Sequence, residues 1–152
     1  YRTQGEPFAR IEQVLNAYAS SHVIVLDPKY SAANWRALAA LLPEGAKDRV
    51  IWKFSVDATW LARQWVADGW RCWGYSYPEH VTSDQLKGWQ EPWTCLGMSW
   101  DASKEVWDKT LAFGKPVWGH ICPTATAYAT ALGKGAVGCM VSGVASLYPS
   151  LV

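Results

Sequence analysis

Charge of either sign is scarce in this sequence. Charged residues make up 18% of the 152 residues, the formal net charge is +1, and no block of lysines and arginines occurs. Nucleic-acid binding through a broad basic face is therefore not expected, because such binding depends on many phosphate contacts. Half of the residues are hydrophobic, which excludes a disordered chain and predicts one folded domain over residues 1–152.

Long apolar runs, a secretory leader and paired cysteines are also missing. No apolar stretch approaches the length of a membrane span. The start, Tyr1 to Gly5, is neither a signal peptide nor an initiator-methionine context, so we expect the domain to come from a longer chain. No Cys-x-x-Cys or zinc motif occurs. Buried free thiols are favoured, and disulfides stay open, for Cys72, Cys95, Cys122 and Cys139.

What the chain does have is a regular alternation of strand-like and helix-like segments. Apolar runs predict strands over 22–27, 50–56, 70–75, 95–99, 116–121 and 136–141. Helical spacing predicts helices over 8–19, 32–42, 58–67, 104–113 and 125–132, with a short one ending at Trp89. This α/β rhythm predicts a parallel sheet covered by helices.

Two closures of such a sheet are possible. One is an open doubly wound sheet of six strands. The other is a (β/α)8 TIM barrel, which has eight strands, so that this chain would supply about six βα units of it. No strand is followed by a glycine-rich phosphate loop, which argues against the nucleotide-binding doubly wound folds and not against a partial barrel.

The first predicted strand ends in a charged pair. Asp27 and Lys29 follow the run Val23 to Leu26 and lie two residues apart, hence on one face of the strand. At the carboxyl end of a parallel strand, where ligands collect, a carboxylate and an ammonium can hold a metal ion and an anionic oxygen. The plainer interpretation is a turn at Asp27-Pro28 with the two charges paired.

Four segments, in order along nearly the whole chain, resemble the glycerophosphodiester phosphodiesterases, a family of TIM barrels. Asp27-Pro-Lys29 is similar to the Glu-x-Lys strand end of the family, with Asp in place of Glu. The other three segments are similar to the family's Pro-Thr-Leu-Glu-Glu-Val-Leu helix, to its penultimate strand and to its last strand; they are 6–15, 115–123 and 135–142. In this register the six strands are the third to the eighth of the barrel.

The sequence also departs from the family. The His-Arg and Glu-x-Asp pairs that carry much of its metal-assisted phosphodiester cleavage are not in this chain, because the three histidines are followed by Val, Val and Ile. His120 stands in place of the family's Trp, and Ser142-Gly143 in place of Thr-Asp. These differences leave open whether the chain is an enzyme by itself.

The chemistry that the resemblance implies assigns roles to seven residues. A divalent cation, Mg or Ca, would draw charge from the phosphoryl oxygens, a positive side chain would stabilise the transition state, and an acid or base would move protons. The expected metal ligand is Asp27 and the expected catalytic residues are Lys29 and His120. Substrate contacts are expected from the aromatic and basic side chains Trp118, Lys53, Trp100 and Tyr75, each of which has packing as its alternative.

The resulting hypothesis is metal-dependent hydrolysis of glycerol-containing phosphodiesters, either small glycerophosphodiesters or wall polymers of the teichoic-acid type. The alternative is a non-catalytic binding or structural barrel module inside a larger assembly, such as a phage tail protein. The 11 tryptophans suit a cleft for sugars, polyols or choline heads but do not choose among them. Expected partners are the substrate and either an upstream segment or assembly proteins, with an extracellular or virion-associated setting favoured.

Overall fold

The structure, a computed structural model, describes residues 9–28, 35–43, 45–142 and 144. Its strands are β1 (Ile24–Leu26), β2 (Val50–Ser55), β3 (Arg71–Tyr75), β4 (Cys95–Ser99), β5 (Val117–Cys122) and β6 (Gly138–Val141). Its helices are α1 (Ile11–Tyr18), α2 (Trp35–Ala40), α3 (Thr59–Ala67), α4 (Pro78–Thr82), α5 (Gln85–Trp89), α6 (Lys104–Leu111) and α7 (Ala125–Gly133), with a 3-10 turn η1 (Ala46–Asp48).

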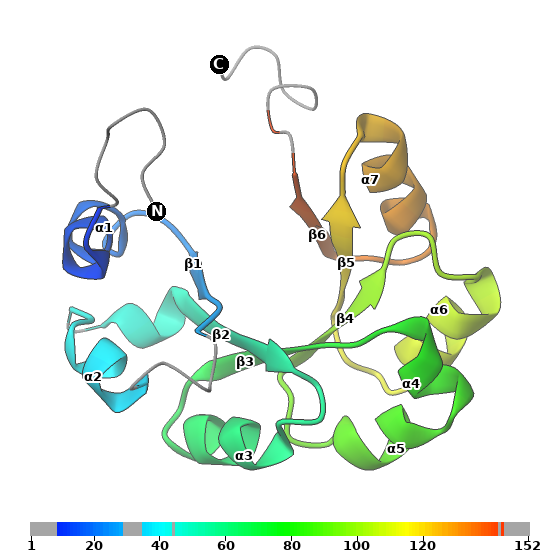
Figure 1. Ribbon diagram of the computed structural model, residues 1–152, viewed down its shortest axis with the longest axis horizontal. Coiled ribbons are helices and arrows are strands. Elements are labelled where there is room, and N and C mark those ends of the chain that lie inside the picture. Colours follow the sequence, from blue (N-terminus) through cyan, green and yellow to red (C-terminus); the bar gives the residue numbers. More distant parts are fainter. Residues whose placement is uncertain (1–8, 29–34, 44, 143, 145–152) are drawn as a thin grey trace.

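The strands form one parallel sheet in the order β1-β2-β3-β4-β5-β6. Each strand pairs with the next in sequence, so the order never reverses as it does in a doubly wound sheet. The sheet curls, with the helices on its convex side (Figure 1). The predicted α/β class is confirmed, and the winding is that of a barrel rather than of an open doubly wound domain.

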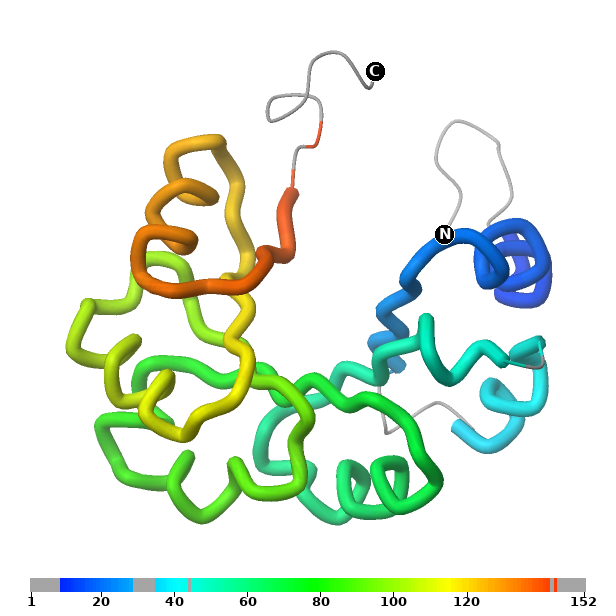
Figure 2. The backbone as a smooth tube through the Cα atoms, turned by 180° about the vertical axis from the view of Figure 1, so that it is seen from behind, coloured from blue at the N-terminus to red at the C-terminus, as the bar shows by residue number. Residues whose placement is uncertain are grey.

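The sheet curls into a half-barrel and does not close within the described residues. Strands β1 and β6 stand at the two ends of the strand order and are not paired with each other. Figure 2, seen from behind, shows the horseshoe that results, with β1 and β6 on opposite sides of the opening. No helix among the described residues is long and apolar enough to cross a membrane.

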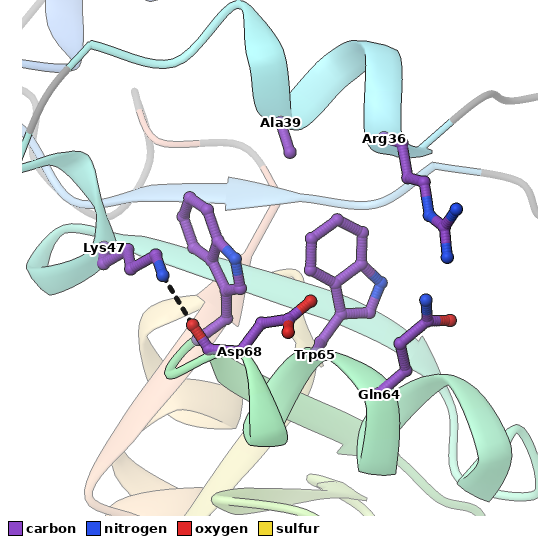
Figure 3. A pocket seen from close by; sticks show the side chains of 7 residues that line it. Arg36, Ala39, Lys47, Gln64, Trp65 and Asp68 are labelled. Carbon is purple, nitrogen blue, oxygen red and sulfur yellow. Dashed lines mark hydrogen bonds between the residues drawn. The ribbon is translucent and has the colours of Figure 1, made fainter.

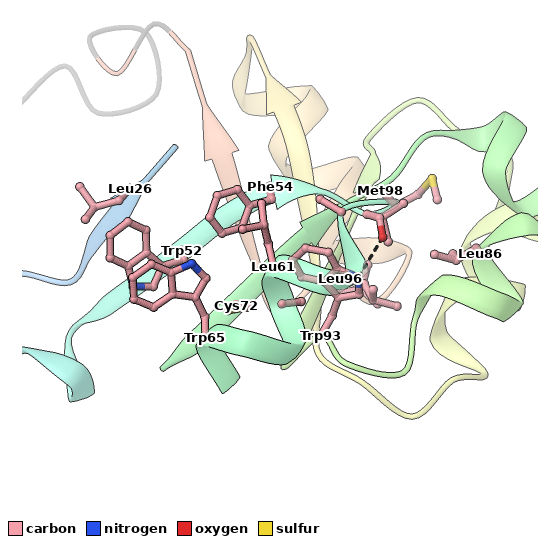
Figure 4. Close-up of a cluster of buried hydrophobic side chains, with 14 of the residues drawn as sticks. Leu26, Trp52, Phe54, Leu61, Trp65, Cys72, Leu86, Trp93, Leu96 and Met98 are labelled. Carbon is pink, nitrogen blue, oxygen red and sulfur yellow. Dashed lines mark hydrogen bonds between the residues drawn. The ribbon is translucent and has the colours of Figure 1, made fainter. Parts of the chain in front are cut away.

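The main hydrophobic core lies between the convex face of the sheet and the helices (Figure 4). Tryptophans make up much of it: the Trp52 ring stacks on Trp65 from α3, with the ring centroids 4.4 Å apart. The buried Trp93 indole donates a hydrogen bond from Nε1 to the carbonyl oxygen of Val56 at 3.0 Å. Several of the 11 tryptophans are therefore core residues, and their packing holds the helices against the outer face of the sheet.

A second, smaller cluster fills the concave face. Buried Ile51, Trp73 and Cys95 pack there together with the half-buried Trp118 and Met140. These residues follow the two-residue alternation of their strands, so the same face continues toward the carboxyl ends of the strands. Trp73 and Tyr75, two residues apart on β3, both belong to this inner face.

Gly97 makes this inner cluster possible. A Cβ atom on Gly97 would lie 2.4 Å from Nε1 of Trp73 and 3.1 Å from Cδ2 of His120. The absence of a side chain on β4 therefore lets a tryptophan from β3 and a histidine from β5 meet across it.

Most element boundaries differ from the predicted ones by one to three residues, and two of the differences have a clear structural reason. Strand β1 is shorter than 22–27, because His22 and Val23 precede the first ladder pair, Ile24 with Val50. Two short helices, α4 and α5, replace the single helix expected before Trp89, and they are separated at Asp84, whose φ of 60° is left-handed and ends a helix. By contrast, β4 coincides with the predicted 95–99.

Candidate functional site

A pocket of about 240 Å³ lies on the inner face, toward the carboxyl ends of the strands. Its lining comes from five strands or the residues that follow them: Asp27, Lys53, Tyr75, Tyr77, His120, Ile121 and Met140. The sheet brings these residues together because the carboxyl ends of parallel strands share one edge. Four of the predicted site residues, Asp27, Lys53, Tyr75 and His120, therefore meet in one cavity.

The centre of the pocket is an ion pair between two strands. Lys53 Nζ lies 2.7 Å from Oδ2 of Asp27. The register pairs Leu26 with Trp52, whose side chains face the main core. The residues that follow them, Asp27 and Lys53, are therefore neighbours on the inner face. The Lys53 side chain is 10% exposed and that of Asp27 is 32% exposed. The cation is thus buried and its carboxylate partner reaches solvent.

Two aromatic rings lie close to the Lys53 ammonium. Its Nζ lies 4.5 Å from the ring centroid of Tyr75 and 5.6 Å from that of Trp73. The negative faces of these rings stabilise a desolvated cation. Lysine has three N–H donors, and Asp27 is the hydrogen-bond acceptor that the described residues provide for it. Among the described residues the ammonium therefore has N–H donors without a protein acceptor, and it lines the cavity.

His120 is fixed by a backbone carbonyl. Its Nε2 lies 2.9 Å from the carbonyl oxygen of Ser76, in a buried position. A carbonyl oxygen only accepts, so Nε2 carries a proton, and in the neutral ring Nδ1 is the atom with a free electron pair. Ser76 is held in turn, because its Oγ donates to the carbonyl of Gly97 at 2.6 Å. The tautomer of His120 is thereby set by two neighbouring strands.

Burial favours the neutral form of His120. Desolvation lowers its pKa, the hydrogen bond to Ser76 partly opposes this by raising it, and the Lys53 ammonium lowers it further. The imidazole is therefore uncharged near neutral pH and can accept a proton at Nδ1.

Three rings of the pocket stand nearly at right angles to one another. Tyr75 and Tyr77 meet at 83° with centroids 5.8 Å apart, and Tyr77 meets His120 at 87° and 5.5 Å. Tyr75 and His120 meet at 82° and 6.3 Å. Such edge-to-face contacts are favourable, and they make walls that limit the cavity to a small ligand.

The divalent cation implied by the resemblance does not fit the described residues. Asp27 is the single carboxylate among the described residues that line the pocket, and Lys53 is bonded to it at 2.7 Å, where a metal ion would need to coordinate. No group of three His, Cys, Asp or Glu side chains suited to a metal occurs in the described part of the chain. Hard cations take six or more oxygen ligands, so the cofactor stays a prediction, and the roles proposed below for the pocket residues do not depend on a metal ion.

The remaining predicted site residues lie elsewhere. Lys29 falls outside the described residues. Trp118 is on the inner face but beneath the pocket, packed against Trp73 with centroids 5.4 Å apart. Trp100 packs against the main core, and its backbone N–H donates to the carbonyl of His120 at 3.0 Å. The pocket lining includes neither Trp100 nor Trp118.

Sequence reasoning did not single out three of the lining residues, Tyr77, Ile121 and Met140. Strand parity signals Met140, because it lies two residues from Gly138, which pairs with the inner-face Trp118. Tyr77 lies two residues beyond Tyr75, past the end of β3, where no ladder pattern remains to predict its direction.

Another pocket, of about 330 Å³, lies on the outer layer between α2, η1 and α3 (Figure 3). Its lining combines the mostly buried Trp65 and Trp70 with the polar side chains of Arg36, Gln64 and Asp68, and Lys47 donates to the Asp68 carbonyl at 2.5 Å. It is remote from the carboxyl ends of the strands, where the reactive groups of parallel α/β barrels collect. We therefore place the candidate site in the inner-face pocket.

No protein-family model matches the chain, and no curated protein matches it either. Solved structures do. A "putative glycerophosphoryl diester phosphodiesterase" from Silicibacter pomeroyi DSS-3 superposes with a TM-score of 0.63 at 13% identity, covering 87% of this chain and 52% of that one. A protein with the same description from Agrobacterium tumefaciens C58 gives a TM-score of 0.60 at 15% identity, covering 86% of this chain and 58% of that one. The chain thus shares their fold and spans little more than half their length.

Proposed function

We propose that this chain forms the phosphoryl-binding side of a barrel that hydrolyses glycerol-containing phosphodiesters. The observation that carries the proposal is the meeting of Lys53, Asp27 and His120 in one pocket at the carboxyl ends of the strands. The similarity to solved structures supports the fold and the family resemblance supports the substrate class. The pocket contributes a buried cation and a neutral base.

The proposed roles follow from the geometry. Lys53 stabilises the charge that grows on the phosphoryl oxygens, since its ammonium is held in a desolvated site where electrostatic interactions are strong. His120 accepts a proton at Nδ1 from the attacking water, because its Nε2 is bonded to Ser76. As the P–O bond to the leaving alcohol breaks, the imidazolium returns this proton to the leaving oxygen. The perpendicular rings of Tyr75 and Tyr77 bound the space for the glycerol or headgroup portion.

The direct test is a hydrolysis assay of the chain with glycerophosphodiesters, with and without Mg²⁺ or Ca²⁺, measuring release of glycerol phosphate. Turnover that falls at least about a hundredfold in His120→Gln supports the assigned base. His22→Gln is the matched control, because His22 is an exposed histidine that bonds to Ser21. Absence of turnover under all of these conditions contradicts a hydrolytic role for the chain by itself.

A non-catalytic binding module is the second candidate. It is favoured by the pairing of Lys53 with Asp27 and of His120 with Ser76, which satisfies both groups without a reaction. The same assay separates the candidates, because a binding module binds the intact glycerophosphodiester and no glycerol phosphate is formed.

A further inference from the structure

The Lys53–Asp27 pair has features of an ion-exchange site rather than of a structural ion pair alone. A structural pair in a protein interior is enclosed on all sides, so that its lone pairs and protons are satisfied by protein. In this pocket the ammonium borders a cavity of about 240 Å³, and it is the carboxylate, not the lysine, that reaches solvent.

The Lys53 side chain is held in place by its surroundings, whereas the Asp27 carboxylate can move away from the ammonium into solvent. The Lys53 stem is buried among the inner-face rings, with Nζ 4.5 Å from the Tyr75 centroid. Asp27 follows the end of β1 and its side chain is 32% exposed, so water can solvate the carboxylate once it moves away. A phosphoryl oxygen that enters the cavity can therefore replace Asp27 at the ammonium without uncovering a buried charge.

From this arrangement we infer that the inner-face pocket binds a phosphate-type oxyanion through Lys53 alone, by exchange against Asp27, without a divalent cation. The inference rests on the proposed function for its class of ligand. It differs in the positive group that binds the phosphoryl oxygens, which is the Lys53 ammonium and not a metal ion. In a metal site Asp27 would attract the ligand through the ion it coordinates. In the exchange site Asp27 competes with the ligand. The two arrangements predict opposite effects of removing the Asp27 charge.

The experiment is titration of the chain with inorganic phosphate and with glycerol 3-phosphate in EDTA, followed by calorimetry and by tryptophan fluorescence. Trp73, 5.6 Å from Lys53 Nζ, supplies the fluorescence signal. We expect saturable binding in EDTA that Mg²⁺ or Ca²⁺ does not strengthen. Lys53→Met should weaken it about ten- to a hundredfold, the value of a charged hydrogen bond. Lys87→Met removes the same charge from an exposed position on α5 and should leave it unchanged.

Asp27→Asn is the deciding variant. The exchange site predicts severalfold tighter phosphate binding, because a competing carboxylate is removed while the amide oxygen still accepts from Lys53. Loss of binding in Asp27→Asn, or binding that appears only with a divalent cation and survives Lys53→Met, overturns the inference. The readout is binding and not turnover, so failure of the hydrolysis assay leaves this result intact, and the reverse also holds.

Discussion

Removing either partner of the Lys53–Asp27 pair should destabilise the fold by unequal amounts. Asp27→Asn leaves an ammonium that is 10% exposed without its counter-charge, whereas Lys53→Met leaves a carboxylate that is 32% exposed. Breaking a fully buried pair costs about 3–5 kcal/mol and an exposed one about 0–1 kcal/mol. We therefore expect about 2 kcal/mol for Asp27→Asn, between these limits.

Lys53→Met should cost less than about 1 kcal/mol, because the Met side chain keeps the apolar contacts of the lysine stem with Trp73 and Tyr75 while water solvates Asp27. The measurement is urea unfolding followed by circular dichroism at fixed ionic strength, for both single variants and the double variant. The double variant should resemble Lys53→Met, since no buried charge remains in it. Equal costs, or a greater cost for Lys53→Met, would refute the assignment of Lys53 as the desolvated partner.

Two further predictions concern the same face. Gly97→Ala places a methyl group 2.4 Å from Nε1 of Trp73 and should cost about 1–3 kcal/mol in urea unfolding; Gly88→Ala in α5, where a Cβ meets nothing within 4 Å, should be neutral or stabilising by up to about 1 kcal/mol. His120 has a pKa lowered by burial, so the unfolded chain binds more protons and stability should fall as the pH drops below about 6.5. His120→Gln should flatten that part of the stability curve between about pH 5 and pH 8, and an unchanged slope would show that the histidine titrates normally.

The fold class follows from the sequence because each buried parallel strand is a short apolar run between turn signals. Strand β2 is buried at five of its six positions and β4 at four of five, a pattern that periodicity detects directly. The strand order is a different matter. Six βα units are compatible with a doubly wound sheet and with a barrel, and it is the unbroken order β1 to β6 that distinguishes them.

The site was only partly predictable, for a reason that lies in the register. The sequence places Lys29 beside Asp27, two residues away, and Lys29 lies outside the described residues. The structure shows Asp27 bonded to Lys53, 26 residues away. That contact depends on Leu26 pairing with Trp52, and a single sequence does not reveal cross-strand pairing. Trp100 and Trp118 do not line the pocket for two different reasons. Trp100 packs against the main core, whereas Trp118 is on the inner face but near the start of β5, away from the carboxyl ends of the strands.

The cluster of aromatic rings on the inner face and the pocket above it pack against each other. Trp73 lies over Gly97, against Trp118, and within 5.6 Å of Lys53 Nζ. Because interiors are close-packed, a change in this ring moves the ammonium above it. Gly97→Ala should therefore weaken phosphate binding as well as stability, although Gly97 itself is not among the lining residues. If Gly97→Ala lowers stability and leaves the affinity for phosphate unchanged, the position of Lys53 does not depend on the rings of Trp73 and Trp118. The ion pair with Asp27 would then be what holds the ammonium in place.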